Sequence, residues 1–187
     1  MKTKWLKQNA KYDGTQLRSL YAYLEHKILG DSAVAWVGPC DVSFEHMVDG
    51  EDLLDRSAIR GSQMLHFIVE IFDQKLMSGV LLQRLFANIA RDLLLEMSSL
   101  KNLEILRIGD DLYWKNKKLS ISIATSSPVS TLVHFAINVS AKGTPVDAAG
   151  LEDLKVETQA FAEKCLQNLK EEYESSLDAT RKVRPVP

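Results

Sequence analysis

The sequence predicts one α+β domain with a central mixed or antiparallel sheet backed by helices. Two observations support this fold class. Several short segments in the middle of the chain alternate apolar and polar residues, which is typical of half-buried strands. Segments on either side have the apolar spacing of amphipathic helices. The chain has 187 residues, so we expect a single domain over 1–187.

Composition excludes several classes of protein. Hydrophobic residues make up 45% of the chain and charged residues 26%, as in ordinary globular domains. A formal net charge of −2 provides no positive field for nucleic acid, so no nucleic-acid partner is expected. No segment approaches the roughly 20 apolar residues of a membrane span, so no membrane partner is expected either. Cys40 and Cys165 form no metal or redox motif, which favours a cytoplasmic protein.

The first third of the chain is expected to hold a short helix, a strand and a long acidic loop. The helix is predicted over Gln16–Lys27 and the strand over Ala33–Val37, between glycine-containing turns. Residues 38–61 carry many carboxylates with no clean period, so we predict a long functional loop inserted before the next strand. One helical turn is expected around Glu51–Arg56.

The rest of the chain alternates strands with two long helices. Alternation over Met64–Phe72 places His66 and Glu70 on the face opposite to an apolar core face. The other predicted elements, in chain order, are a helix over Gly79–Met97, a strand over Leu103–Ile108, a hairpin of Asp111–Lys115 and Lys118–Ala124 around Asn116-Lys117, a strand over Thr131–Ser140 that ends at Gly143-Thr144-Pro145, and a mostly helical segment over Leu151–Leu177.

Lys118 begins an alternating strand directly after a turn. Period-two geometry predicts that Leu119, Ile121 and Ile123 face the core and that Lys118, Ser120 and Ser122 face the other side. If the neighbouring strands align, His66, His134 and Asn138 join this polar surface, and Ser120 and His134 can lie opposite each other. A lysine ammonium there suits a carboxylate or phosphate. The simpler interpretation is a solvated lysine beside a turn.

Three short motifs carry a family resemblance. They are Arg107-Ile108-Gly109-Asp110-Asp111-Leu112-Tyr113, Lys117-Lys118-Leu119-Ser120-Ile121 and His134-Phe135-Ala136-Ile137-Asn138-Val139. They resemble the K-W-P-N-D-L-Y, R-K-L-A-G-I and G-x-N-V segments of biotin protein ligases, and the second is similar to K-I-S-G-S of lipoate ligases. The segments G-P-C-D-V, M-V-D-x-E-D and M-L-H-F-I-V-E resemble an uncharacterised prokaryotic family, a domain of unknown function, of the same superfamily.

The resemblance implies a biotin/lipoate protein ligase-like fold and a ligase-like protein that binds a small carboxylate or acyl-adenylate. It further implies ATP and Mg²⁺ as cofactors, an acceptor protein as partner, a catalytic Lys118 and a ligand-binding Asp111. Arg60-Gly61-Ser62 stands where biotin ligases carry a Gly/Arg-rich loop, and Arg107 is a candidate anion clamp. The polar strand faces add further candidate ligand-binding residues, namely His66, Ser120, Ser122, His134 and Asn138.

Two departures from the ligases leave other functions open. The Gly/Arg-rich loop is reduced to three residues, and Ile121 replaces a ligase glycine, which is expected to narrow the pocket. One alternative is a non-catalytic small-molecule-binding or regulatory protein on the same fold. Another is a metal-dependent hydrolase, in which the acidic loop binds a metal through Asp41, His46, Asp49, Glu51 and Asp52. A solvated acidic loop is the simpler interpretation of that segment.

Overall fold

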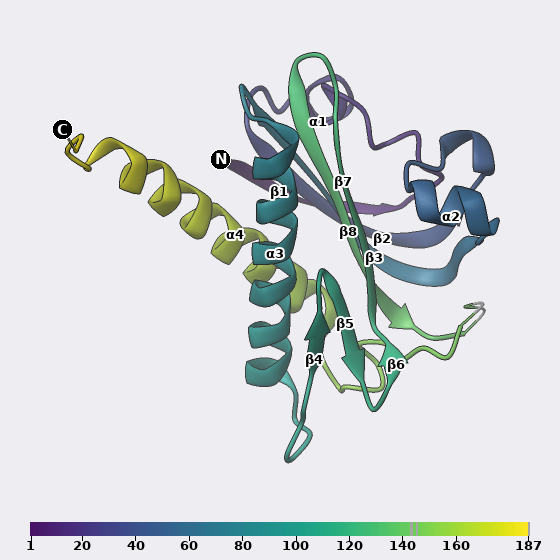
Figure 1. The fold of residues 1–187 in the computed structure, drawn as a ribbon. Helices are drawn as coiled ribbons and strands as arrows, with labels where there is room; N and C mark the ends of the chain where they lie inside the picture. The colour runs from purple at the N-terminus through teal and green to yellow at the C-terminus, as the bar shows by residue number, and fades with distance from the viewer. Residues whose placement is uncertain (143, 145, 187) are drawn as a thin grey trace.

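A five-stranded mixed sheet forms the centre of the molecule (Figure 1). The structure is a computed structural model and describes residues 1–142, 144 and 146–186. The strand order is β1-β2-β3-β8-β7, in which β1 runs parallel to β2 and the other pairs are antiparallel. The strands are β1 (Lys2–Asn9), β2 (Ser32–Val42), β3 (Ile59–Phe72), β7 (Ser120–Ser126) and β8 (Ser130–Ser140). The predicted mixed α+β class is therefore confirmed.

A small three-stranded sheet lies beside the main one. It consists of β4 (Leu106–Ile108), β5 (Asp111–Trp114) and β6 (Lys117–Lys118). Lys115 and Asn116 both have left-handed backbones, with φ of 50° and 65°, and form the two-residue turn between β5 and β6. Such a turn matches the twist of antiparallel strands. The predicted hairpin is present, with its turn one residue earlier than expected.

Two long helices cover one face of the main sheet. They are α3 (Leu76–Met97) and α4 (Thr158–Arg181), and the end of α4 extends beyond the sheet (Figure 1). The main core lies between these helices and the sheet, and its largest side chains include Phe67, Phe86 and Phe135. The rings of Phe67 and Phe86 meet edge to face with centroids 4.9 Å apart, a favourable aromatic geometry.

The opposite face of the sheet carries a second, smaller core. The segment between β1 and β2 folds over this face and contributes Tyr12 and Tyr21, which pack with Trp36. The helix in this segment, α1 (Tyr21–His26), is shorter than predicted. Leu20 and Lys27, on either side of it, have left-handed backbones, with φ of 63° and 60°, and these residues end the helix.

Three predictions about elements were wrong. β1 was not predicted, because it is an edge strand whose lysine-rich sequence buries only Leu6. The loop expected over 38–61 is shorter, because β2 extends to Val42 and β3 begins at Ile59. It contains a 3-10 turn (Phe44–His46) and α2 (Gly50–Asp55), which confirms the predicted helical turn.

The third error concerns the C-terminal helix, which begins at Thr158 and not near residue 151. The Glu157 side chain accepts hydrogen bonds from the backbone N–H groups of Gln159 and Ala160 and caps the helix there. The break predicted at Gly143-Thr144-Pro145 lies outside the described residues except for Thr144. None of the helices formed by the described residues combines the length and apolar character needed to cross a bilayer.

Gly79 provides a test of the packing between α3 and the sheet. A Cβ at this position would overlap Cγ2 of Thr131 on β8. Gly79→Ala should therefore lower stability by about 1–3 kcal/mol through overpacking, although alanine favours helix by about 1 kcal/mol. Urea unfolding followed by circular dichroism measures the change.

Gly50→Ala is the matched control for Gly79→Ala. No atom lies within 4 Å of a Cβ built at Gly50 in α2, so this change should leave stability the same or slightly higher. Equal stability of the two variants would contradict the close approach of α3 to β8.

Candidate functional site

A cavity of about 450 Å³ lies between the sheet, the α2 segment and the turn before β5. Most of the predicted site residues line it, and they come from segments far apart in the chain. The predicted residues in its wall are His46, Asp49, Glu51, Asp52, Arg60, Asp111, Lys118, Ser120, Ser122, His134 and Asn138. The predicted residues Asp41, Gly61, Ser62, His66 and Arg107 are not in that wall.

Lys118 and Asp111 form an ion pair in the cavity wall. Nζ of Lys118 lies 2.8 Å from Oδ2 of Asp111, and the hydroxyl of Tyr113 donates to the same oxygen at 3.3 Å. Burial acts to lower the pKa of Lys118, but the hydrogen bond and charge of Asp111 outweigh it and raise the pKa. Both side chains keep about a quarter to a third of their surface exposed, so a charged ammonium is available to a ligand.

The backbone of Lys118 is held on both sides. Its N–H donates to the carbonyl of Asp147 at 3.0 Å, and its carbonyl accepts from the N–H of Ala149 at 3.1 Å. The buried Asn138 amide donates to the Lys118 carbonyl at 3.2 Å and to the Ala149 carbonyl at 3.1 Å. Asn138 thus positions Lys118 and the segment around Ala149.

The predicted alternation of faces after Lys118 was wrong. β6 ends at Lys118 and β7 begins at Ser120, so the strand is interrupted at Leu119. Ser120 pairs with Ile137 and Ser122 with Phe135, which are main-core residues on the helix face. Ile121 and Ile123 pair with Ala136 and His134 instead and pack against the second core. Ser120 therefore does not lie opposite His134.

The two serines bond to protein groups in this structure. The hydroxyl of Ser120 accepts from the backbone N–H of Leu112 at 2.9 Å. Ser122 donates to Oδ2 of Asp110 at 2.7 Å and accepts from the amide of Gln83 at 2.9 Å. Gln83 also donates to Asp110 at 2.8 Å, so one buried glutamine on α3 connects the turn before β5 to β7.

Sequence reasoning missed Gln83. Its only signal is a polar residue between Leu82 and Phe86 on the apolar side of a predicted helix. Asp110 also lines the cavity, and its Oδ1 lies 4.0 Å from the guanidinium of Arg84.

The acidic α2 segment forms the opposite wall of the cavity. The Asp49 carboxylate caps α2 by accepting from the N–H of Glu51 at 2.8 Å and of Asp52 at 3.5 Å. Burial and the neighbouring Asp49 charge raise the pKa of Asp52, and the positive charge of Lys118 opposes this shift. Asp52 therefore lies within electrostatic reach of Lys118. Within the described ranges, no three His, Cys, Asp or Glu side chains are grouped as a metal ion requires.

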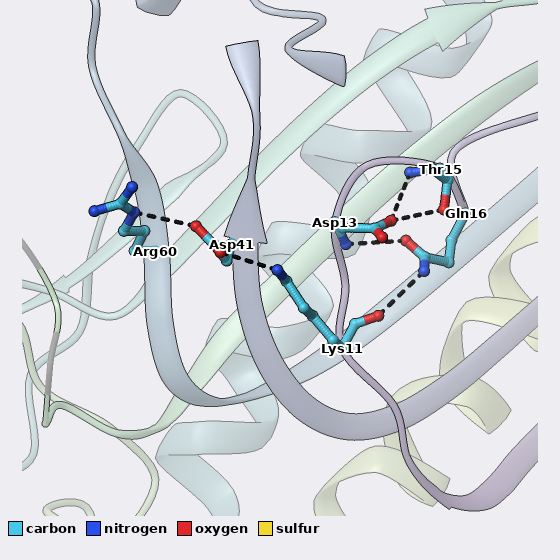
Figure 2. A network of polar contacts seen from close by, with 6 residues as sticks. All are labelled: Lys11, Asp13, Thr15, Gln16, Asp41 and Arg60. Carbon is cyan, nitrogen blue, oxygen red and sulfur yellow. Dashed lines mark hydrogen bonds and ion pairs between the residues drawn. The ribbon is translucent and has the colours of Figure 1, made fainter. Parts of the chain in front are cut away.

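Asp41, one of the proposed metal ligands, does not line the cavity and forms ion pairs with Lys11 and Arg60 (Figure 2). Its carboxylate lies 2.9 Å from Nζ of Lys11 and 3.1 Å from Nε of Arg60. The hydrogen bond from Lys11 and its charge, followed by those of Arg60, lower the pKa of Asp41. Gln16 donates to the Lys11 carbonyl, so this network joins the segment before α1 to the ends of β2 and β3.

The remaining candidates have structural partners. A Cβ at Gly61 would lie 2.8 Å from Sδ of Met64, so the packing favours glycine there. The Ser62 hydroxyl donates to the Lys142 carbonyl, and the guanidinium of Arg107, on the exposed β4, donates to the Gly109 carbonyl. Cys40, which is not among these candidates, is buried, and burial and the charge of Asp41 raise the pKa of its thiol to about 12.

His66 and His134 form a buried pair, of which His134 lines the cavity. Nδ1 of His66 lies 3.1 Å from Nε2 of His134, and Nε2 of His66 lies 3.2 Å from the Gly38 carbonyl. The ring of Tyr12 stacks on His134 with centroids 3.8 Å apart. Burial lowers the pKa of His66 to about 4, and burial and His66 lower that of His134 well below its ordinary value. Both rings are therefore neutral at neutral pH.

The buried histidines predict a loss of stability in mild acid. The unfolded chain binds protons at histidine near pH 6.5, whereas folded His66 does so only near pH 4. Stability should therefore fall as the pH decreases from about 6.5 toward 4, by an amount on the order of 3 kcal/mol for His66 over the full interval. Urea unfolding at pH 7.5 and pH 5 measures this change.

Two variants identify the groups responsible for the acid sensitivity. The double variant His66→Phe/His134→Phe should lose much of the stability difference between the two pH values. His46→Ala, at an exposed position, should retain it. The same pH dependence in the double variant and the wild type would show that other groups cause it.

Two proteins are similar to this chain in sequence. The chain is 35% identical over 158 residues to the uncharacterized protein MJ0805 of Methanocaldococcus jannaschii. The aligned residues cover 81% of this chain and 70% of that protein. A solved protein of unknown function from Pyrococcus horikoshi superposes with a TM-score of 0.92 at 40% identity. This match covers 99% of our chain and 100% of that chain.

More distant structures share the fold. The biotin protein ligase from Aquifex aeolicus in complex with biotin and ATP has a TM-score of 0.58 at 19% identity, covering 91% of this chain and 69% of the ligase. The putative lipoate protein ligase Ta0514 from T. acidophilum, with bound lipoic acid, has a TM-score of 0.55 at 14% identity. This match covers 91% of this chain and 86% of that chain. The predicted biotin/lipoate ligase-like fold is thus confirmed. A family model described as "Domain of unknown function (DUF366)" matches residues 1–184, and this chain belongs to that family.

Proposed function

We propose that this protein binds a small carboxylic acid, whose carboxylate is received by the ammonium of Lys118. The observation that carries the proposal is the Lys118–Asp111 pair in the wall of a 450 Å³ cavity, on a fold shared with biotin and lipoate ligases. A charged ammonium with a restrained backbone is a preorganised partner for an anion. Biotin and lipoic acid, bound by the two distant ligases, define the size of acid to test first.

An incoming carboxylate would compete with Asp111 for the Lys118 ammonium. Lys118 keeps about a third of its side-chain surface exposed, so it can contact a ligand while it remains near Asp111. Tyr113 donates to Asp111 and offers that carboxylate a second partner. Binding therefore need not leave an unpaired buried charge, which would be costly.

We further propose nucleotide-dependent acyl transfer as the reaction of this site. A carboxylate oxygen would attack the α-phosphorus of ATP, and the bond to pyrophosphate would break. An amine would then attack the acyl carbon, the bond to AMP would break, and the amine would lose a proton. Lys118 would stabilise negative charge on the transferred groups. The cavity wall holds the carboxylates of Asp49, Glu51, Asp52, Asp110 and Asp111, so a triphosphate would need Mg²⁺ to offset their charge.

A non-catalytic binding protein on the same fold is the second candidate, and two observations favour it. Ile121 stands where the ligases have a glycine, and it lines the cavity, so its side chain leaves less room there than a glycine would. Arg60, Gly61 and Ser62 lie within β3, so they are part of a paired strand and not of a free loop over the cavity. Retained acid binding without pyrophosphate release would support this candidate.

Replacement of Lys118 tests the proposed site. Lys118→Ala should abolish most binding of octanoate, biotin or lipoic acid in calorimetry. If pyrophosphate forms from ATP and Mg²⁺, its rate should fall by roughly a hundred- to thousandfold, as when one charge-stabilising donor is removed. The midpoint of thermal unfolding shows whether the variant remains folded.

Lys117→Ala is the matched control for Lys118→Ala. Lys117 is the neighbouring residue, pairs with Asp147 at 3.4 Å and does not line the cavity. The Lys117→Ala variant should retain the binding of these acids and any formation of pyrophosphate. Equal small effects of both replacements on every acid would remove Lys118 from the site.

A further inference from the structure

We infer that the cavity takes a carboxylic acid whose far end carries a neutral O–H or N–H group, and that this group donates a hydrogen bond to Nδ1 of His134. The inference rests on the proposed function for the carboxylate end of the ligand. It adds the chemical class of the other end and names the residue that selects it.

The Gly38 carbonyl determines which nitrogen of each histidine carries the proton. A carbonyl only accepts hydrogen bonds, so His66 must donate to it through Nε2–H. In a neutral ring, Nδ1 of His66 then has no proton and accepts a hydrogen bond. His134 must therefore donate through Nε2–H, because its Nε2 lies 3.1 Å from that atom. Neutral His134 is left with Nδ1 as an unprotonated acceptor.

The acceptor on His134 is accessible from the cavity. His134 lines the cavity although its residue surface is only 3% exposed. Among the described residues, no group donates to its Nδ1. Within the part of the chain that the structure describes, the polar side-chain atoms that are both fully covered and without a hydrogen-bond partner are Nε2 of His26 and Oγ of Ser32. Nδ1 of His134 has no partner in that part either but is not one of these atoms, so it is not fully covered. This nitrogen therefore retains contact with cavity space, where a ligand donor can reach it.

The ring of His134 is held in place from two directions. Tyr12 stacks on it at 3.8 Å with an interplanar angle of 12°, and His66 holds its Nε2. Low pKa values for both histidines make them poor proton acceptors, so hydrogen bonding to a neutral donor is the chemistry that this arrangement favours. An ammonium or a second carboxylate would suit this end of the cavity less well.

Strand geometry gives an approximate scale for the separation between His134 and the backbone of Lys118. His134 and Asn138 are four residues apart on β8 and face the same side, so their Cα atoms are separated by about 13 Å. Asn138 holds the backbone of Lys118. A ligand that contacts both Lys118 and His134 is therefore an extended acid of medium length, and 8-hydroxyoctanoate is of comparable size.

Three probes separate the two ends of the site. Octanoate carries only the carboxylate, 1-octanol carries only the hydroxyl, and 8-hydroxyoctanoate carries both. Calorimetry with the full chain should show 8-hydroxyoctanoate binding about three- to tenfold more tightly than octanoate, as one added hydrogen bond implies. In wild-type protein with ¹⁵N-labelled histidine, 8-hydroxyoctanoate and 1-octanol should shift the Nδ1 resonance of His134, and octanoate should not.

Replacement of His134 tests the assignment to this residue. His134→Phe keeps an aromatic ring against Tyr12 and should bind both acids with equal affinity. Lys118→Ala should weaken both acids alike and retain the shift caused by 1-octanol. Should His134→Phe fail to fold, the Nδ1 resonance of the wild type still decides the question.

The outcomes distinguish failure of this inference from failure of the proposed function. Equal affinity of the two acids in the wild type, with no shift at Nδ1, would overturn the donor-binding role of His134 and leave carboxylate binding intact. A shift with 1-octanol but no binding of octanoate would support the role of His134 and overturn carboxylate binding. No binding of any of the three probes would overturn both.

Discussion

Strand β3 is hydrogen-bonded to β2 on one side and to β8 on the other, and the rest of the molecule depends on this double pairing. Because side chains alternate along a strand, one register determines two surfaces at once. Phe67 and Phe135 pair on the helix face and form part of the main core. His66 lies one residue away on the other face, next to His134. A shift of the β3 register by one residue would turn its core side chains toward the face of the histidine pair and His66 toward the main core.

The interruption at Leu119 couples the core to Lys118. The backbone of Leu119 donates to the Leu112 carbonyl and accepts from the N–H of Asn138, and its side chain is buried in the main core. The alternation of side chains between the two faces of the sheet therefore does not continue from β6 through Leu119 into β7. Lys118 reaches the cavity wall from β6, while Ser120 belongs to β7 and bonds to the backbone of Leu112. The burial of Leu119 in the main core thus fixes the position of the neighbouring Lys118 in the cavity wall.

The cavity has two chemically different regions. At one end, Lys118, Asp111 and the α2 segment provide charged groups that keep partial access to solvent. At the other end, the stacked rings of Tyr12 and His134 line the cavity, and both are buried and neutral, with His66 hydrogen-bonded to His134 outside the wall. Electrostatic interactions are stronger where water is excluded. A ligand that matches both regions must combine an anionic end with a neutral polar end.

Local patterns in the sequence determined the class of fold and most of its central elements. The alternation in Met64–Phe72 and Thr131–Ser140 and the apolar spacing of Gly79–Met97 are periodic signals that need no tertiary information. The motif around Asp111 and Lys118 likewise pointed to two residues that the structure brings within 2.8 Å of each other. These features depend on residues close together in the chain.

Features that depend on long-range pairing were decided only by the tertiary structure. β1 is a strand because β2 provides its partner, and its sequence buries too little to show a period. The face of Ser120 follows from the break at Leu119, which rests on contacts with distant segments. The protonation of His134 follows from the Gly38 carbonyl, nearly a hundred residues away in the chain, acting through His66. A hydrogen bond between distant residues leaves no local pattern, so the sequence alone contains no signal for it.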